Sequence, residues 1–99
     1  MRELTSGQRQ HLRRLAHDIR PVVQIGKQGV TDKAVATVDQ ALDAHELIKI
    51  KFLDYQDQRH ALSADLATSL GAALVGVVGN VAIVYRRQRD PERRKIELS

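Results

Sequence analysis

The chain has 99 residues and a formal net charge of +4. This length allows one hydrophobic core, so we expect a single folded domain rather than two. The absence of cysteine excludes disulfides, thiolate metal sites and a cysteine nucleophile. A pI of about 9.9 favours a polyanionic partner. Aromatic residues make up only 3% of the chain, which argues against a platform of aromatic side chains on which bases stack.

Membrane insertion and secretion are not indicated. The first six residues are not followed by the apolar region of a signal peptide. The longest apolar run, residues 72–78, is far shorter than the ~20 residues of a membrane helix. We therefore expect a cytoplasmic protein with no membrane partner.

Apolar spacing near the N-terminus predicts a helix that ends at about Asp18. Its apolar stripe consists of Leu12, Leu15, Ala16 and Ile19. Arg9 and Arg13 fall on one side of this helix, beside the stripe rather than opposite it. Such a basic row either faces a partner or forms a solvated surface, and the sequence supports both interpretations equally.

A glycine loop follows the first predicted strand. Pro21 ends the helix, and the β-branched run of residues 22–25 is typical of a short buried strand. The strand leads into Gly-Lys-Gln-Gly at residues 26–29, and Thr31 is placed to cap the next helix. Glycines, a lysine and a helix N-terminus together favour phosphate binding. The same spacing also serves any sharp turn from a strand into a helix.

The middle of the chain contains the strongest strand signal. A second helix is predicted from Thr31 to about His45. Residues 47–52 then alternate with period two, which places Lys49 and Lys51 on the face opposite the apolar side chains. One face of the sheet is therefore expected to lie under helices, and the other to be partly open and to carry lysines.

The remaining elements complete an α-β-α-β-α-β-β order. A third helix is predicted over residues 59–70, and strands 73–78 and 81–85 flank a Gly79-Asn80 hairpin turn. This order predicts an α/β fold, a two-layer sandwich with a four-stranded mixed sheet and helices on one side. Residues 1–86 form the predicted domain, and residues 87–99 a basic, mobile tail in which Ile96 and Leu98 dock weakly.

No catalytic or metal-binding constellation is evident. The histidines are dispersed and lack the spacing of metal ligands; they are His11, His17, His45 and His60. The chain contains no nucleophile elbow, Walker-type loop or dinucleotide fingerprint. We therefore expect no enzyme activity, no metal, no cofactor and no small-molecule substrate.

Several spaced motifs resemble the YhbY family, the stand-alone bacterial form of the CRM (chloroplast RNA splicing and ribosome maturation) domain. They occur in the expected order and cover almost the whole chain. They are residues 12–17 (LRRLAH), 21–31 (PVVQIGKQGVT) and 45–51 (HELIKIK), followed by Gly79 and residues 84–86 (VYR).

The resemblance implies an RNA-binding protein associated with precursors of the large ribosomal subunit. It also implies a fold similar to the C-terminal domain of bacterial translation initiation factor three, with an extra N-terminal helix. The family's RNA contacts are attributed to the G-x-x-G loop, which corresponds here to Gly26, Lys27, Gln28 and Gly29. Further candidate RNA contacts follow only from the charge pattern, and these are Arg9, Arg13, Lys33, Lys49 and Lys51.

Ribosomal RNA, or the precursor particle that contains it, is thus the expected partner, and the protein is expected to act without catalysis. Two other interpretations stay open. One is a DNA-binding protein of the nucleoid, because related topologies bind DNA and fold does not fix function. The other is an adaptor whose basic tail contacts an acidic protein. The sequence leaves the oligomeric state open, with a monomer as the expectation.

Overall fold

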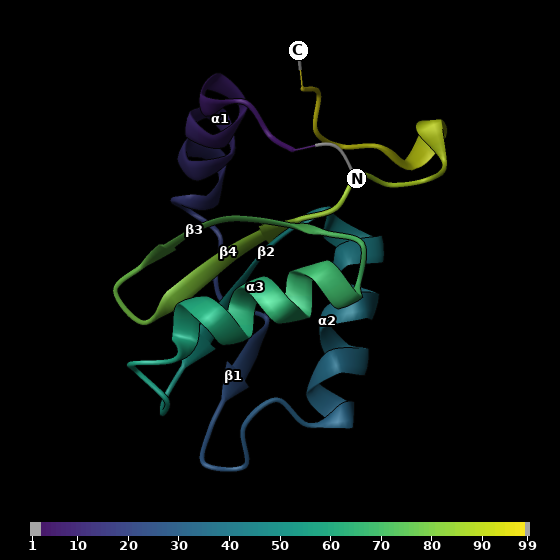
Figure 1. The fold of residues 1–99 in the computed structure, drawn as a ribbon. Helices are drawn as coiled ribbons and strands as arrows, with labels where there is room; N and C mark the ends of the chain where they lie inside the picture. The colour runs from purple at the N-terminus through teal and green to yellow at the C-terminus, as the bar shows by residue number, and fades with distance from the viewer. Residues whose placement is uncertain (1–2, 99) are drawn as a thin grey trace.

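The computed structural model of the protein describes residues 3–98. Within this range the elements are α1 (Ser6–Ala16), β1 (Val23–Ile25), α2 (Asp32–His45), β2 (Leu47–Phe52), α3 (Arg59–Ser69), β3 (Ala73–Val78), β4 (Val81–Tyr85) and the short 3-10 helix η1 (Pro91–Arg93). The strands form one sheet in the order β1-β2-β4-β3 (Figure 1). β1 and β2 are parallel, and the other two pairs are antiparallel. The predicted element order and mixed four-stranded sheet are confirmed.

The prediction that all helices lie on one side of the sheet is wrong for α1. α2 and α3 cover one face, with Val38, Leu42 and Leu66 in the core between the layers. α1 packs on the other face, where Leu12 and Ala16 are fully buried. Figure 1 shows α1 and α3 on opposite sides of β3 and β4.

The cause lies in the strands, which are apolar on both faces at the end that α1 covers. Leu47 and Tyr85, which pair across β2 and β4, are buried on the α1 side. Their neighbours Ile48 and Val84, which alternate with them, are buried on the other side. Two buried faces require two covering layers. Leu47 shares its face with Lys49 and Lys51, and for that reason the sequence did not reveal this second core.

An arginine side chain ties α1 to the sheet. Half-buried Arg9 donates from Nη1 to the carbonyl oxygens of Leu74 and Val75, at 2.6 and 3.1 Å. These carbonyls lie where the β3–β4 register shifts between Leu74 and Gly76. The guanidinium thus donates to two carbonyls at an irregular stretch of an edge strand.

The C-terminal segment, residues 87–98, lies against the domain, whereas the sequence predicted a mobile tail. Glu46 follows α2 with a φ of 65°, and only 1% of this residue is exposed. Its carboxylate accepts the backbone N–H groups of Gln88, Lys95 and Ile96 at 3.0, 2.6 and 3.1 Å. Three bonds from backbone donors compensate the cost of burying the carboxylate.

The docked segment also completes the second core. Ile96 and Leu98 pack against the cluster that contains Tyr85. Burial, and secondarily the Glu46 carboxylate, raise the pKa of the Tyr85 phenol, although two arginines of the segment act in the opposite direction. The phenol is therefore neutral at physiological pH, as its apolar surroundings require.

In residues 3–98 no helix is long and apolar enough to span a bilayer.

Candidate nucleic-acid interface

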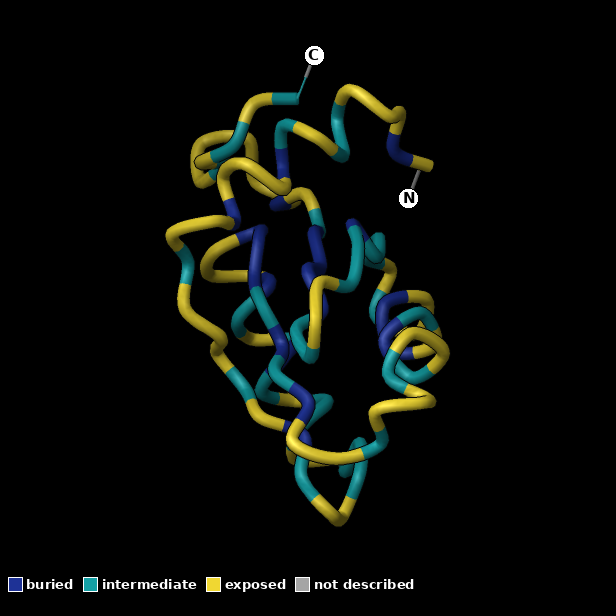
Figure 2. Tube along the Cα trace, turned by 90° about the vertical axis from the view of Figure 1, so that its left-hand side faces the viewer, coloured by how far each residue is buried: buried dark blue, intermediate teal, exposed yellow. Residues whose placement is uncertain are grey.

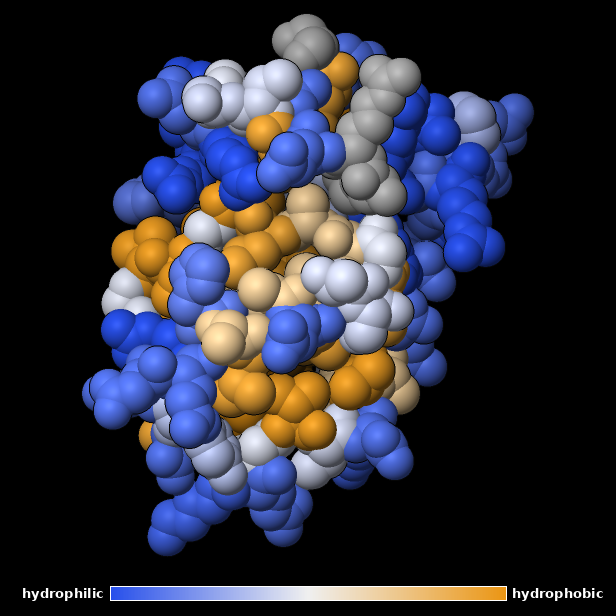
Figure 3. Space-filling view, viewed as in Figure 1, coloured by the Kyte–Doolittle hydropathy of each residue, from blue (hydrophilic) through white to orange (hydrophobic). Residues whose placement is uncertain are grey.

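The glycine loop, residues 26–31, lies at one end of the molecule. Because β1 and β2 are parallel, their carboxyl ends meet at the same sheet edge, and the N–H of Leu53 donates to the carbonyl of Ile25 at 2.8 Å. Lys27 and Gln28 are exposed at the tip. Figures 1 and 2 show the loop projecting at the end opposite the chain termini. This end of the molecule is hydrophilic in Figure 3.

A turn and a helix cap fix the path of the loop. The N–H of Gly29 donates to the carbonyl of Gly26 at 3.0 Å, which closes a four-residue turn. The N–H of Ala34 donates to Oγ1 of Thr31 at 3.1 Å. Thr31 is thus the N-cap of α2, as predicted. The loop ends at the positive end of the α2 dipole, which favours an anion close by.

The two glycines of the loop have different roles. Gly29 has a φ of 74°, a left-handed conformation that side chains rarely adopt. Gly26 has no such φ, and a Cβ placed on it would meet no atom within 4 Å. The backbone conformation therefore favours glycine at position 29 but not at position 26. At Gly26 the missing side chain leaves the backbone open to an approaching ligand.

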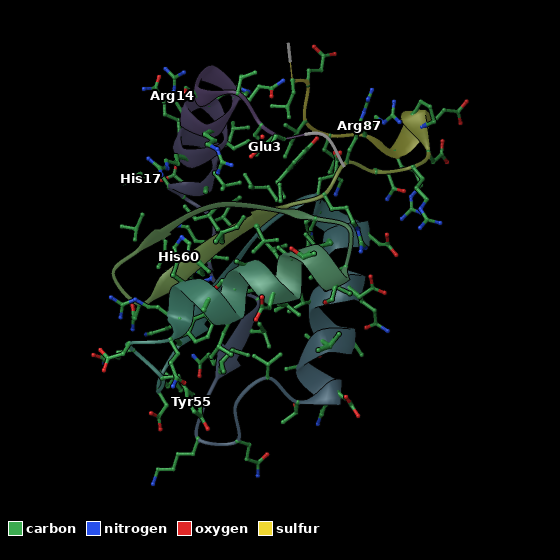
Figure 4. All side chains as sticks on the ribbon, in the orientation of Figure 1. Glu3, Arg14, His17, Tyr55, His60 and Arg87 are labelled. Atoms are coloured by element: carbon green, nitrogen blue, oxygen red, sulfur yellow. The ribbon has the colours of Figure 1, made fainter. Side chains whose placement is uncertain are left out.

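Tyr55 supports the loop from the β2–α3 connection and is a residue that the sequence did not indicate. Its hydroxyl donates to the carbonyl of Lys27 at 2.5 Å. Its ring lies 3.7 Å from the Cβ position of Gly29. Tyr55 itself has a φ of 58°. Figure 4 shows its side chain directed toward the loop. The hydrogen bond joins residues 28 positions apart, and no local pattern signals such a pair.

Removing the Tyr55 hydroxyl should loosen the loop without unfolding the domain. We expect Tyr55→Phe to lower the free energy of unfolding by about 0.5–1.5 kcal/mol, the usual net value of one hydrogen bond. Hydrogen exchange should accelerate at the amides of residues 27–29 and stay unchanged in β4. If the substitution changed the exchange rate equally in residues 27–29 and in β4, Tyr55 would not be what holds the loop.

The other candidate RNA contacts fall into three places. Lys33 is exposed in the first turn of α2, next to the loop. Arg13, Lys49 and Lys51 lie on the α1 side of the sheet. Arg9 is committed to the carbonyls of β3, so its observed contacts are structural. Lys33 thus lies beside residues 26–29, whereas Arg13, Lys49 and Lys51 lie on the sheet face that α1 partly covers.

Not every arginine after β4 is available to a partner. Arg86 forms ion pairs with Asp39 and Asp43, at 2.7 and 3.0 Å. It also donates to the carbonyls of Leu70 and Asp39 at 3.0 and 2.9 Å.

Across residues 3–98, no group of three or more His, Asp or Glu side chains is placed to hold a metal ion. The glycine loop itself offers backbone amides and the exposed side chains of Lys27 and Gln28.

The fold and this loop define a small α/β domain that presents a lysine-bearing glycine loop at a helix N-terminus. The family model for the CRS1/YhbY (CRM) domain matches residues 4–86. The chain belongs to this family. The predicted resemblance is confirmed.

Relatives cover the chain almost completely. A Bacillus subtilis protein, named as the probable RNA-binding protein YqeI, is 33% identical over 96% of this chain and 98% of its own length. A Haemophilus influenzae protein, named as an RNA-binding protein, is 35% identical over 99% of this chain and 97% of its own length. The names of these relatives indicate RNA-binding proteins rather than enzymes.

A solved structure has the same fold. The solution structure of the Staphylococcus aureus hypothetical protein SAV1595, described as "a putative RNA binding protein", superposes with a TM-score of 0.80 at 32% identity. The match covers 96% of this chain and all of the other. The α/β fold class predicted from the sequence is thereby confirmed.

Proposed function

We propose that this protein binds RNA without catalysis and acts in assembly of the large ribosomal subunit, gripping the RNA backbone through residues 26–29. The observation that carries the proposal is Gly26, a glycine that neither conformation nor space within the protein requires. Family membership and the names of the relatives support RNA as the partner. The association with the large subunit is supported by the resemblance to the YhbY family.

In this proposal four features of the loop and of the first turn of α2 hold a phosphate. The open backbone at Gly26 admits the RNA, and exposed Lys27 supplies a positive charge at the tip. The N-terminus of α2 adds its dipole, and its first turn carries Lys33 beside the opposite charge of Asp32. Tyr55 keeps the turn in place before RNA arrives, which lowers the entropy lost on binding.

Lys27→Ala tests the contact with phosphate. We expect weaker binding to ribosomal RNA and a log-log salt slope lower by roughly 0.7 to 0.9, the value for one lost phosphate contact. Arg93→Ala, at an exposed position of η1, is the matched control with the same charge change. If Lys27→Ala and wild type had equal salt slopes, Lys27 would make no contact with phosphate.

Competition between nucleic acids decides between ribosomal RNA and DNA. Labelled large-subunit RNA bound to the protein is titrated with duplex DNA at constant salt. We expect DNA to compete poorly at concentrations where unlabelled RNA displaces the probe. Efficient displacement by DNA would instead favour the nucleoid interpretation.

A further inference from the structure

The sheet face on the α1 side is covered over only part of its length. Gln24, Lys51, Val81 and Val78 pair in register across all four strands and share this face. Gln24 and Val78 are exposed, and Lys51 and Val81 are half-buried. At 63% exposure, Val78 is the most exposed large apolar residue of the described chain. This row therefore lies beyond the cover that α1 provides.

The adjacent row carries two further cations. Lys49 pairs with Ile83, and Ile83 pairs with Gly76. A Cβ placed on Gly76 would lie 2.7 Å from Nη2 and 3.1 Å from Nε of Arg13. The guanidinium of Arg13 thus occupies the space that a side chain at position 76 would fill. Glycine at position 76 allows an arginine from α1 to rest on the sheet.

The charged side chains of this area are all cations, and none of them forms an ion pair. We call the area formed by Arg13, Gln24, Lys49, Lys51, Val78 and Val81 the open sheet face. It contains no acidic side chain. The two ion pairs found in residues 3–98 both belong to Arg86, so the three cations of the open sheet face have none. Lys49 donates to the carbonyl of His17 at 3.3 Å, which holds its ammonium at the edge of α1.

We propose that the open sheet face binds an unpaired segment of the RNA that the glycine loop holds. Phosphates contact the three cations, and bases or riboses pack on Val78 and Val81. A duplex would present mainly its phosphates, leaving these valines unused, whereas an unpaired strand presents apolar base faces as well. β1 joins the two areas, because Gln24 precedes Gly26 by two residues, about 7 Å along a strand. This inference rests on the proposed function and adds the class of RNA.

The test compares two double variants of equal charge. Arg13→Ala with Lys51→Ala alters the open sheet face, and Arg89→Ala with Arg93→Ala alters two exposed side chains of the C-terminal segment. The probes are a short labelled single-stranded RNA and a hairpin of the same composition. Losing two single-strand contacts should lower the salt slope by about 1.4, which is roughly 25-fold in affinity at about 0.1 M monovalent salt. The control pair should keep the wild-type slope for the single strand.

Gly76→Ala supplies a variant without any charge change. The added methyl group displaces the flexible end of Arg13, and thermal unfolding verifies that the fold persists. We expect the slope for the single strand to fall by about 0.7, because one contact is lost. If Lys27→Ala weakens binding but neither variant of the open sheet face does, this inference is overturned and the proposed function stands. Equal or stronger binding of the hairpin also overturns it, whereas a wild-type protein that binds neither RNA overturns the proposed function itself.

Discussion

Gly26→Asp is expected to weaken RNA binding by about tenfold or more, since like charges placed at an interface cost several kcal/mol. The aspartate would place a carboxylate where the loop backbone is open to a phosphate. Stability should change by no more than about 0.5 kcal/mol, because a side chain at this position meets no atom within 4 Å and requires no positive φ. Fluorescence anisotropy with labelled ribosomal RNA gives the affinity, and thermal unfolding verifies the fold.

Two further substitutions can be compared with Gly26→Asp. Gly26→Asn has nearly the same size without the charge, so it separates repulsion of the phosphate from loss of space. Gly29→Asp is less informative, because the φ of 74° makes any side chain there strained and destabilising. Wild-type affinity in both Gly26 variants would mean that RNA does not approach this part of the loop.

Glu46→Ala is expected to destabilise the domain by about 2–4 kcal/mol, since hydrogen bonds to a charged group are stronger than neutral ones and three depend on this carboxylate. The N–H groups of Gln88, Lys95 and Ile96 would lose their acceptor, and residues 87–98 would separate from the second core. Urea unfolding measures the loss. Hydrogen exchange should accelerate at Lys95 and Ile96 while the α2 amides stay protected.

Glu97→Ala is the matched control, because Glu97 belongs to the same segment and is exposed. It should change stability by no more than about 0.5 kcal/mol. An identical unfolding midpoint for Glu46→Ala and Glu97→Ala would show that the buried carboxylate does not anchor the segment.

Because Glu46 holds the basic C-terminal segment against the domain, deleting the segment does not test its role in binding alone. Deleting residues 87–99 would expose the second core and remove the three donors of the Glu46 carboxylate. A loss of function after deletion would therefore report on stability. Arg89→Gln with Arg93→Gln changes the charge of this segment while keeping the backbone contacts to Glu46. Retained RNA affinity in that pair would show that RNA binding does not depend on the charge of the segment.

Local patterns were sufficient to predict most of the fold. The period-two alternation of residues 47–52 gave the central strand and the correct faces for Lys49 and Lys51. Thr31 was recognised as a cap because its spacing to the helix is a local property. Such features depend on neighbours within a few residues, so the sequence carries them directly.

Long-range side-chain contacts were not predictable in this way. Arg9 bonds to carbonyls 65 and 66 residues away, and Glu46 to amides 42 to 50 residues away. In the sequence Arg9 therefore resembles an RNA contact, and Glu46 an ordinary residue between a helix and a strand. The support of the loop by Tyr55 was missed for the same reason, because it becomes visible only when the carboxyl ends of β1 and β2 meet.

Ultraviolet crosslinking in cells, with identification of both the attached RNA and the attached peptide, tests the central claim most directly. Our account predicts crosslinks from residues 26–29 to one region of large-subunit ribosomal RNA, and their loss in Gly26→Asp. Crosslinks confined to residues 87–99, or an attached nucleic acid that is mainly DNA, would contradict it.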